Sequence, residues 1–267
     1  MKRLIKSLIL VCLVVTMTAG CQSLLKLTYK NEDFEWVTKE NLGKVVIQST
    51  RDKGFRFVVT DEATLKELYE SLSSAMAVEE KNPLAPDYIF EFNTFENQVI
   101  KFYYTTGSGS AETRGNFYND EKSFLVLNRI DNNIIKNLFA LRKPRDFFKG
   151  YYGSLLEAVK QVQADYKVTA VGVMVNEDKE MLKFQMSYEL LDFNLALNAL
   201  GAIPITEDKE TELVMNIKTR GYTTDLYKAV VEVKNNKDRK TRSYYIKSDY
   251  VGEKWTTIVT TERPDGF

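Results

Sequence analysis

The chain of 267 residues carries 37 basic and 37 acidic side chains, no histidine and two cysteines. The charge balance excludes a nucleic-acid binder that relies on a basic patch. The absence of histidine excludes Ser-His-Asp and Cys-His nucleophiles and histidine-ligated zinc. Because 44% of the residues are hydrophobic and 12% are aromatic, the chain can bury enough apolar surface for one or two folded domains.

The first 20 residues have the layout of a secretory signal peptide. Three basic side chains precede an apolar run over residues 8–15, which is shorter than the roughly 20 residues of a membrane-spanning helix. The tetrapeptide Thr18-Ala19-Gly20-Cys21 resembles a bacterial lipobox, although Thr18 stands where that motif usually has an aliphatic residue. The resemblance implies cleavage between Gly20 and Cys21 and a diacylglyceryl thioether on Cys21. The alternative is an uncleaved signal anchor.

Lipidation of Cys21 predicts where the protein resides. Two or more acyl chains hold a protein firmly on a membrane, so we expect the lipid bilayer as a partner through acylated Cys21. The expected location is the extracytoplasmic face of the cell membrane of a Gram-positive bacterium. Cys12 leaves with the signal peptide, so the mature chain has no pair of thiols for a disulfide. The expected segments are a signal peptide over 1–20, a lipidated tether over 21–43, and two domains over 44–143 and 150–267.

The first expected domain begins with two strands, over 44–50 and 55–60, joined by a turn at Gly54. A helix over 61–77 follows, because apolar side chains recur there at helical spacing and Asp61 is suited to cap its start. That apolar stripe consists of Leu65, Leu68, Leu72 and Met76. The remaining expected elements are strands over 88–95, 99–105, 117–119 and 123–128 and a closing helix over 130–141. This order indicates an antiparallel sheet with packed helices.

The arrangement over 44–141 resembles a known family. A strand pair, a helix with an acidic cap, Pro86-Asp87-Tyr88 at the start of a strand, a hairpin and a closing helix are similar to the YhfM-like domain of uncharacterised Gram-positive lipoproteins. The resemblance covers less than half of the chain. It implies an α+β fold and a location at the cell membrane, and it implies no activity.

A second domain is expected to begin after Pro144, which disfavours a helical conformation at the residue before it. Its expected elements are a helix over 154–166, a strand over 168–175, a turn over 176–179, a strand over 182–190, a helix over 193–200 capped by Asp192, and strands over 212–219, 225–234, 241–250 and 254–261. The strand over 182–190 is predicted from its alternating apolar and polar residues. The long antiparallel meander suggests a curved sheet, loosely similar to cystatin or nuclear-transport-factor-2-like folds.

Asp87 and Tyr88 are the candidate binding residues, because they open a strand directly after a proline. The alternative role of Asp87 is to accept hydrogen bonds from backbone N–H groups at the strand entrance. The tyrosine pairs 103–104, 151–152 and 244–245, together with Tyr250, are a further candidate. In each pair we expect one ring in the core and one at the surface, where a tyrosine suits a peptide or a sugar.

Three polar loop segments have compositions that suggest a ligand. The Gly- and Ser-rich stretch 107–115 lacks the spacing of a dinucleotide fingerprint, and 176–180 lacks the alternating ligands of a calcium loop. The basic run 235–242 could contact an anionic polymer or lipid headgroups. We expect a surface loop, a hairpin turn and a solvated hairpin tip, respectively. The sequence therefore assigns no catalytic residue, no metal site and no cofactor.

These features predict an α+β fold of two domains behind a signal peptide, each domain a mainly antiparallel sheet with one or two packed helices. We expect a membrane-anchored lipoprotein without enzymatic activity that binds an envelope protein or a wall polymer, and no nucleic acid. The alternative is a histidine-free cell-wall hydrolase that uses carboxylates or a Ser-Lys pair. A solute-binding protein for a transporter is a third hypothesis, although the alternating βα units of such proteins are not visible in the sequence.

Overall fold

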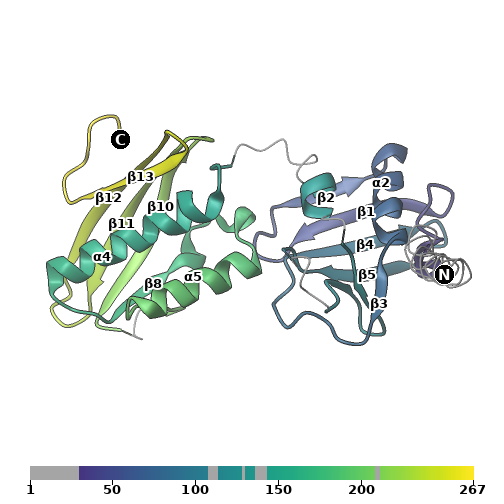
Figure 1. Ribbon diagram of the computed structural model, residues 1–267, viewed down its shortest axis with the longest axis horizontal. Helices are drawn as coiled ribbons and strands as arrows, with labels where there is room; N and C mark the ends of the chain where they lie inside the picture. The colour runs from purple at the N-terminus through teal and green to yellow at the C-terminus, as the bar shows by residue number, and fades with distance from the viewer. Residues whose placement is uncertain (1–29, 108–113, 128–129, 136–142, 208–210) are drawn as a thin grey trace, which may run out of the picture.

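The computed structural model describes residues 30–107, 114–127, 130–135, 143–207 and 211–267. Two sheets follow one another along the longest axis of the molecule, each with helices on one face (Figure 1). The predicted α+β class with two mainly antiparallel sheets is therefore confirmed. Across the described part of the chain, no helix is both long and apolar enough to cross a membrane. The predicted signal peptide and Cys21 lie outside the described residues.

The first domain is a seven-stranded antiparallel sheet with the strand order β2-β1-β4-β5-β6-β7-β3. Its strands are β1 (Leu42–Ser49), β2 (Arg56–Val59), β3 (Met76–Val78), β4 (Tyr88–Thr94), β5 (Val99–Tyr104), β6 (Phe117–Tyr118) and β7 (Ser123–Leu125). Its helical segments are the 3₁₀ turn η1 (Glu32–Phe34), the helix α2 (Glu62–Ser73) and the π-helical turn η2 (Asp131–Ile135). The helix predicted over 130–141 is thus described only as far as residue 135.

Phenylalanine rings fill the core between this sheet and α2. The ring centroid of Phe34 lies 4.7 Å from that of Phe124, and Phe102 stacks on Phe117 at 4.8 Å. Phe34 belongs to η1 and is fully buried. Asn31, just before η1, is also buried, and its side chain donates a hydrogen bond to the main-chain oxygen of Ala75. The folded part of the chain therefore includes residues from 31 onward, inside the segment predicted as a tether.

Helix α2 begins as predicted and ends four residues early. Asp61 caps its start by accepting a hydrogen bond from the main-chain N–H of Thr64. The hydroxyl groups of Ser73 and Ser74 donate to main-chain oxygens one turn back, and such bonds compete with continuation of a helix. Met76, predicted to lie on the apolar stripe, instead starts β3, which pairs with β7.

The second domain is a six-stranded mixed half-barrel with the strand order β13-β12-β11-β10-β8-β9. Its strands are β8 (Val171–Met174), β9 (Ile203–Pro204), β10 (Leu213–Tyr222), β11 (Leu226–Asn235), β12 (Thr241–Val251) and β13 (Lys254–Thr260). Its helical segments are the π-helical turn η3 (Phe148–Gly153), α4 (Ser154–Tyr166), the 3₁₀ turns η4 (Val175–Glu177) and η5 (Leu182–Phe184), and α5 (Ser187–Ala199). The buried side chains of α4, α5 and the sheet form one core.

The last four strands of this sheet were predicted, and two parallel pairs were not. Strand β8 runs parallel to both β10 and β9. The pairing of β8 with β9 is parallel because α5 forms the crossover connection between them. The hairpin predicted at 235–242 is confirmed, since the main-chain N–H of Asn235 donates to the oxygen of Lys240 between β11 and β12.

The strand predicted over 182–190 is wrong. Residues 182–184 form η5, and α5 starts at Ser187, five residues before its predicted cap. The buried side chains within α5 include Glu189, Phe193 and Leu197, which recur every fourth residue as on one face of a helix. The alternating pattern spans the junction of two short helical elements and does not mark a strand.

The hairpin turn predicted at 176–179 is wrong for the same reason, because no strand follows it. Residues 175–177 form η4 instead, and Asp178 after it is buried. The Asp178 carboxylate accepts hydrogen bonds from the main-chain N–H and the hydroxyl group of Thr219, at 3.1 and 2.7 Å. This segment is therefore attached to β10 and is not a solvated loop.

Two of the three tyrosine pairs bury one ring, as predicted: Tyr104 and Tyr244 are in the cores. Tyr151 and Tyr152 are both fully buried, so the prediction for that pair is wrong. Alternation between faces holds for strands, whereas these two residues lie in the π-helical turn η3. Their rings contact Tyr227 of β11 and Phe193 of α5, respectively.

Candidate functional site

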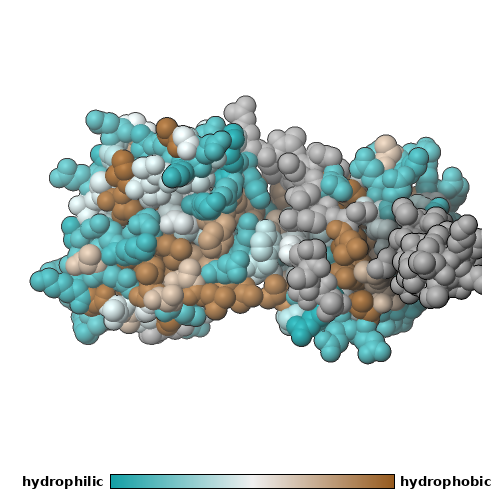
Figure 2. Space-filling model, viewed as in Figure 1, coloured by the Kyte–Doolittle hydropathy of each residue, from teal (hydrophilic) through white to brown (hydrophobic). Residues whose placement is uncertain are grey.

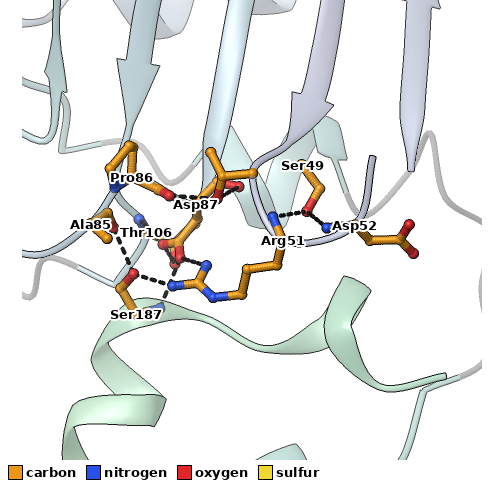
Figure 3. Close-up of polar contacts among 9 residues, drawn as sticks. Ser49, Arg51, Asp52, Ala85, Pro86, Asp87, Thr106 and Ser187 are labelled. Carbon is orange, nitrogen blue, oxygen red and sulfur yellow. Dashed lines mark hydrogen bonds and ion pairs between the residues drawn. The ribbon is translucent and has the colours of Figure 1, made fainter. Parts of the chain in front are cut away.

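Asp87 lies at the junction between the two domains, directly before β4 (Figure 3). Asp87 is only 2% exposed to solvent. One carboxylate oxygen, Oδ1, accepts from Arg51 Nη1 at 2.6 Å and from the main-chain N–H of Ser187 at 2.8 Å. The other oxygen, Oδ2, accepts from the main-chain N–H and the hydroxyl group of Thr106, at 2.8 and 2.7 Å. Four donors thus satisfy the buried carboxylate, as burial of a charge requires.

Arg51 extends the same network across the junction (Figure 3). It lies in the turn between β1 and β2, and its second guanidinium nitrogen donates to the hydroxyl group of Ser187. That hydroxyl group donates in turn to the main-chain oxygen of Ala85 at 2.6 Å. We call Arg51, Asp87, Thr106 and Ser187 the junction cluster. It connects three loops of the first domain to the first residue of α5 in the second.

The junction cluster explains how α5 begins. Met186 precedes the helix and has no side chain that can cap it. The carboxylate of Asp87 accepts a hydrogen bond from the main-chain N–H of Ser187 instead, so the first domain supplies the cap. A carboxylate at a helix N-terminus also interacts favourably with the helix dipole. The side chain of Met186 packs against the core of the first domain. The start of α5 is therefore held by one polar and one apolar contact across the junction.

Tyr88, the other candidate binding residue, is also buried, at the start of β4 among the residues of the first core. Its neighbour Asp87 satisfies two backbone N–H groups, those of Thr106 and Ser187, which is the alternative role considered from the sequence. Neither side chain is exposed to a ligand in this conformation. Gly20 and Cys21 lie outside the described residues, as do residues 108–113 of the predicted surface loop.

Gly107, at the described end of that loop, lies against α5. Its backbone has a positive φ of 78°, and an added Cβ would come within 2.3 Å of the ring of Tyr188. A glycine is required here on both counts. Gly107 therefore lies directly over the start of α5, next to Thr106 of the junction cluster.

Helix α5 carries an apolar stripe on its exposed side. Leu191 and Leu195 are 45% and 59% exposed, and Ile203 of β9 is 41% exposed. In Figure 2 hydrophobic residues form a brown band along the lower edge of the second domain, where Figure 1 places α5. Leu191 and Leu195 are one helical turn apart, so they lie on the same face. We call Leu191, Leu195 and Ile203 the α5 stripe.

A groove of about 630 Å³ lies at the opposite rim of the second domain, between η3 with the start of α4 and the β12–β13 hairpin. Its apolar lining is Phe148, Tyr250 and Trp255, all partly exposed. Its polar lining includes Asp146, Lys149, Glu157, Glu253, Lys254 and Thr257. We call this the aromatic groove. Of its aromatic lining, sequence reasoning singled out only Tyr250 and missed the groove itself, because its walls come from segments about 100 residues apart and neither carries a local motif.

Within the described ranges, no three or more Asp, Glu or Cys side chains lie close enough together to hold a metal ion. Asp178, in the segment after η4, is a buried carboxyl group that contacts β10 of the second sheet. Burial raises its pKa, and the hydrogen bonds from Thr219 lower it by less, so the net shift is upward. Its contacts with β10 show a structural role in attaching the segment after η4.

Comparison with known proteins finds a match for the first domain only. No curated protein and no solved structure matches the chain. Residues 38–144 match the model of the family described as YhfM protein, a range that begins six residues before the predicted resemblance and ends just before the second core starts at Phe147. The first of the two domains, over residues 38–144, is therefore a YhfM family domain.

Proposed function

We propose that the chain is a non-enzymatic adaptor of the bacterial cell envelope, anchored on the outer face of the membrane through a lipid on Cys21, that binds an envelope protein through the α5 stripe. The observation that carries this proposal is the exposure of Leu191 and Leu195 on a helix whose opposite face is already buried. Contiguous exposed apolar side chains mark interaction sites on soluble domains.

The anchor and the junction would together orient this surface. Only the nine residues from Gln22 to Lys30 separate Cys21 from the folded domain, and they span at most about 30 Å when fully extended. Asn31 hydrogen-bonds to Ser73 at the end of α2, and α2 crosses the first sheet in the half of that domain farther from the second (Figure 1). The second domain is then the membrane-distal one, and the junction cluster fixes the direction of α5.

Site-specific photo-crosslinking in cells tests the adaptor role. A photoreactive amino acid at Leu195 should crosslink one reproducible envelope protein, and the same amino acid at Val58, which is similarly exposed on β2 of the first domain, should not. The variant Cys21→Ala should leave the membrane fraction and lose the crosslink. A lipid anchor without any crosslink from Leu195 would overturn the adaptor role while leaving the location intact.

An assay on purified wall material distinguishes an adaptor from the hydrolase alternative. Wall material incubated with the protein should release no soluble fragments if the chain is non-enzymatic. Time-dependent release of glycan or peptide fragments by the wild-type protein would overturn the non-enzymatic proposal and favour carboxylate chemistry.

A further inference from the structure

We propose that the aromatic groove binds an uncharged oligosaccharide, at a site separate from the α5 stripe. The inference goes beyond the proposed adaptor role and would give the adaptor a second attachment point, to a neutral wall or surface glycan. It rests on four features of the groove: a fixed aromatic surface, charges of both signs, a cluster of hydroxyl groups and unusual backbone at one rim.

The aromatic surface is held in place before any ligand arrives. The indole Nε1–H of Trp255 donates to the main-chain oxygen of Arg145 at 2.8 Å, and the ring lies directly against Gly150. Tyr250 meets Trp255 edge to face, with the centroids 5.5 Å apart. Trp255 nevertheless stays partly exposed. Rigid aromatic rings of this kind provide apolar contact area at small entropic cost, and the C–H face of a sugar ring is a matching partner for the negative face of an aromatic ring.

Three of the five charged side chains that line the groove form ion pairs. Asp146 and Lys149 form an ion pair at 2.6 Å, in which the hydrogen bond raises the pKa of Lys149. Glu157 pairs with Lys160 at 2.7 Å, and the remaining two, Glu253 and Lys254, have opposite charges. A charged ligand would have to compete with these pairs. The hydroxyl groups of a neutral sugar can donate to the carboxylates and accept from the ammonium groups without separating them.

Three hydroxyl groups meet at the groove wall. Ser154 donates to the main-chain oxygen of Gly150 at 2.6 Å, and that oxygen can only accept. Ser154 therefore accepts from its hydroxyl neighbours, Ser248 at 2.6 Å and Thr257 at 3.3 Å, while Ser248 and Thr257 are 2.9 Å apart. Whichever of these two donates to the other, at least one lone pair of Thr257 Oγ1 stays available to accept a hydrogen bond from a ligand hydroxyl group at the groove wall.

The backbone on one side of the groove adopts conformations that are uncommon. Phe148 and Lys149 belong to the π-helical turn η3, and such turns are rare and frequently found at functional sites. Asp146, just before this turn, has a left-handed φ of 43°, and strained non-glycine residues tend to occur at ligand sites. On the other side, the φ of 64° at Glu253 is ordinary, because Glu253 lies in the two-residue turn between β12 and β13. The unusual backbone from Asp146 to Lys149 supports a binding role.

Trp255 can report binding directly, because the chain has two tryptophans and Trp36 lies in the first domain. In full-length Trp36→Phe protein, in a detergent without a sugar headgroup, we expect titration with chitotetraose, cellotetraose or maltotetraose to change Trp255 emission saturably for at least one probe. Tyr250→Ala should weaken that binding at least tenfold. Tyr245→Ala, on the same strand and the opposite face, should leave it within twofold.

Three results would overturn the proposal. One is the absence of a saturable change in Trp255 emission with any of the three sugars up to about 10 mM, which would place each dissociation constant above that concentration. Another is tighter binding of an anionic oligosaccharide, and the third is binding of an uncharged peptide instead of a sugar. If Trp36→Phe does not fold, saturation-transfer NMR with the wild-type protein measures the same contact. A negative sugar titration with a positive crosslink at Leu195 would reject the groove ligand and keep the adaptor role.

Discussion

The carboxylate of Asp87 caps helix α5 by accepting a hydrogen bond from the main-chain N–H of Ser187, which is 100 positions further along the chain, at 2.8 Å. The same oxygen accepts from Arg51 at 2.6 Å. One buried carboxylate therefore holds the turn after β1, the entrance to β4 and the start of α5 together. This contact joins the two domains at the start of α5, together with the packing of Met186 against the first core.

Removal of the Asp87 carboxylate should destabilise the protein strongly. Asp87→Ala leaves the partly buried Arg51 without its ionic partner and the first N–H of α5 without an acceptor. Loss of one partner of a buried ion pair typically costs about 3–5 kcal/mol. We expect a fall of that size in the free energy of unfolding, measured in urea. Glu91→Ala is the matched control, because Glu91 forms a half-exposed ion pair with Lys101 on the same sheet, and such pairs contribute about 0–1 kcal/mol.

A side chain at Gly107 should disturb the junction without changing any charge. The Cβ of Gly107→Ala would clash with the ring of Tyr188, and its φ of 78° is unfavourable for alanine. Left-handed backbone alone costs a non-glycine residue about 1–3 kcal/mol. We expect reduced stability and a larger radius of gyration in X-ray scattering, as the domains move apart. Gly221→Ala meets no atom within 4 Å and should leave both quantities unchanged.

The difference between α2 and α5 shows what the sequence could predict. The start of α2 is predictable because its cap, Asp61, and its apolar stripe are local. The start of α5 is not, because Met186 cannot cap it and the cap comes from Asp87 in the other domain. The alternating residues before the helix then resemble a strand, and no local feature contradicts that interpretation.

The candidate sites follow the same division. Pro86-Asp87-Tyr88 drew attention to Asp87, but Arg51 and Ser187 could not be paired with it, since no local spacing relates them. The aromatic groove could likewise not be predicted from the sequence, because Phe148 and Trp255 come together only when η3 packs against the β12–β13 hairpin. Long-range contacts decide both sites, whereas the four strands from β10 to β13 are predicted by their own alternation and turns.

Substitution of Gly150 should change the aromatic groove without touching its polar lining. The Cβ of Gly150→Ala would lie 2.8 Å from two ring carbons of Trp255, so the indole has to move away from Arg145. We expect a red shift of Trp255 emission in the Trp36→Phe background and loss of sugar binding. Gly153 also lines the groove, but Gly153→Ala in the same π-helical turn has its nearest contact at 3.7 Å, with a main-chain oxygen and not with the indole. It should leave the emission unchanged, and an altered emission in this control would show that η3 itself has rearranged.

Asp178 should make the protein more stable in mild acid, relative to an isosteric neutral variant. Because burial raises its pKa in the folded state, the folded protein binds this proton more tightly than the unfolded chain does. The contribution to stability is therefore fully present below the unfolded pKa and is lost as the pH rises through the folded pKa. Asp178→Asn keeps an acceptor for the N–H of Thr219 and removes the titration.

Urea unfolding between pH 7 and pH 4 measures this effect. The stability of the wild-type protein, minus that of Asp178→Asn, should increase as the pH falls. Asp61→Asn should give a difference of the opposite sign, because hydrogen bonds from Thr64 lower the pKa of Asp61 and its contribution disappears as the pH falls. Equal slopes for the two variants would mean that the Asp178 carboxyl is solvated in solution and that the segment after η4 does not stay docked on β10.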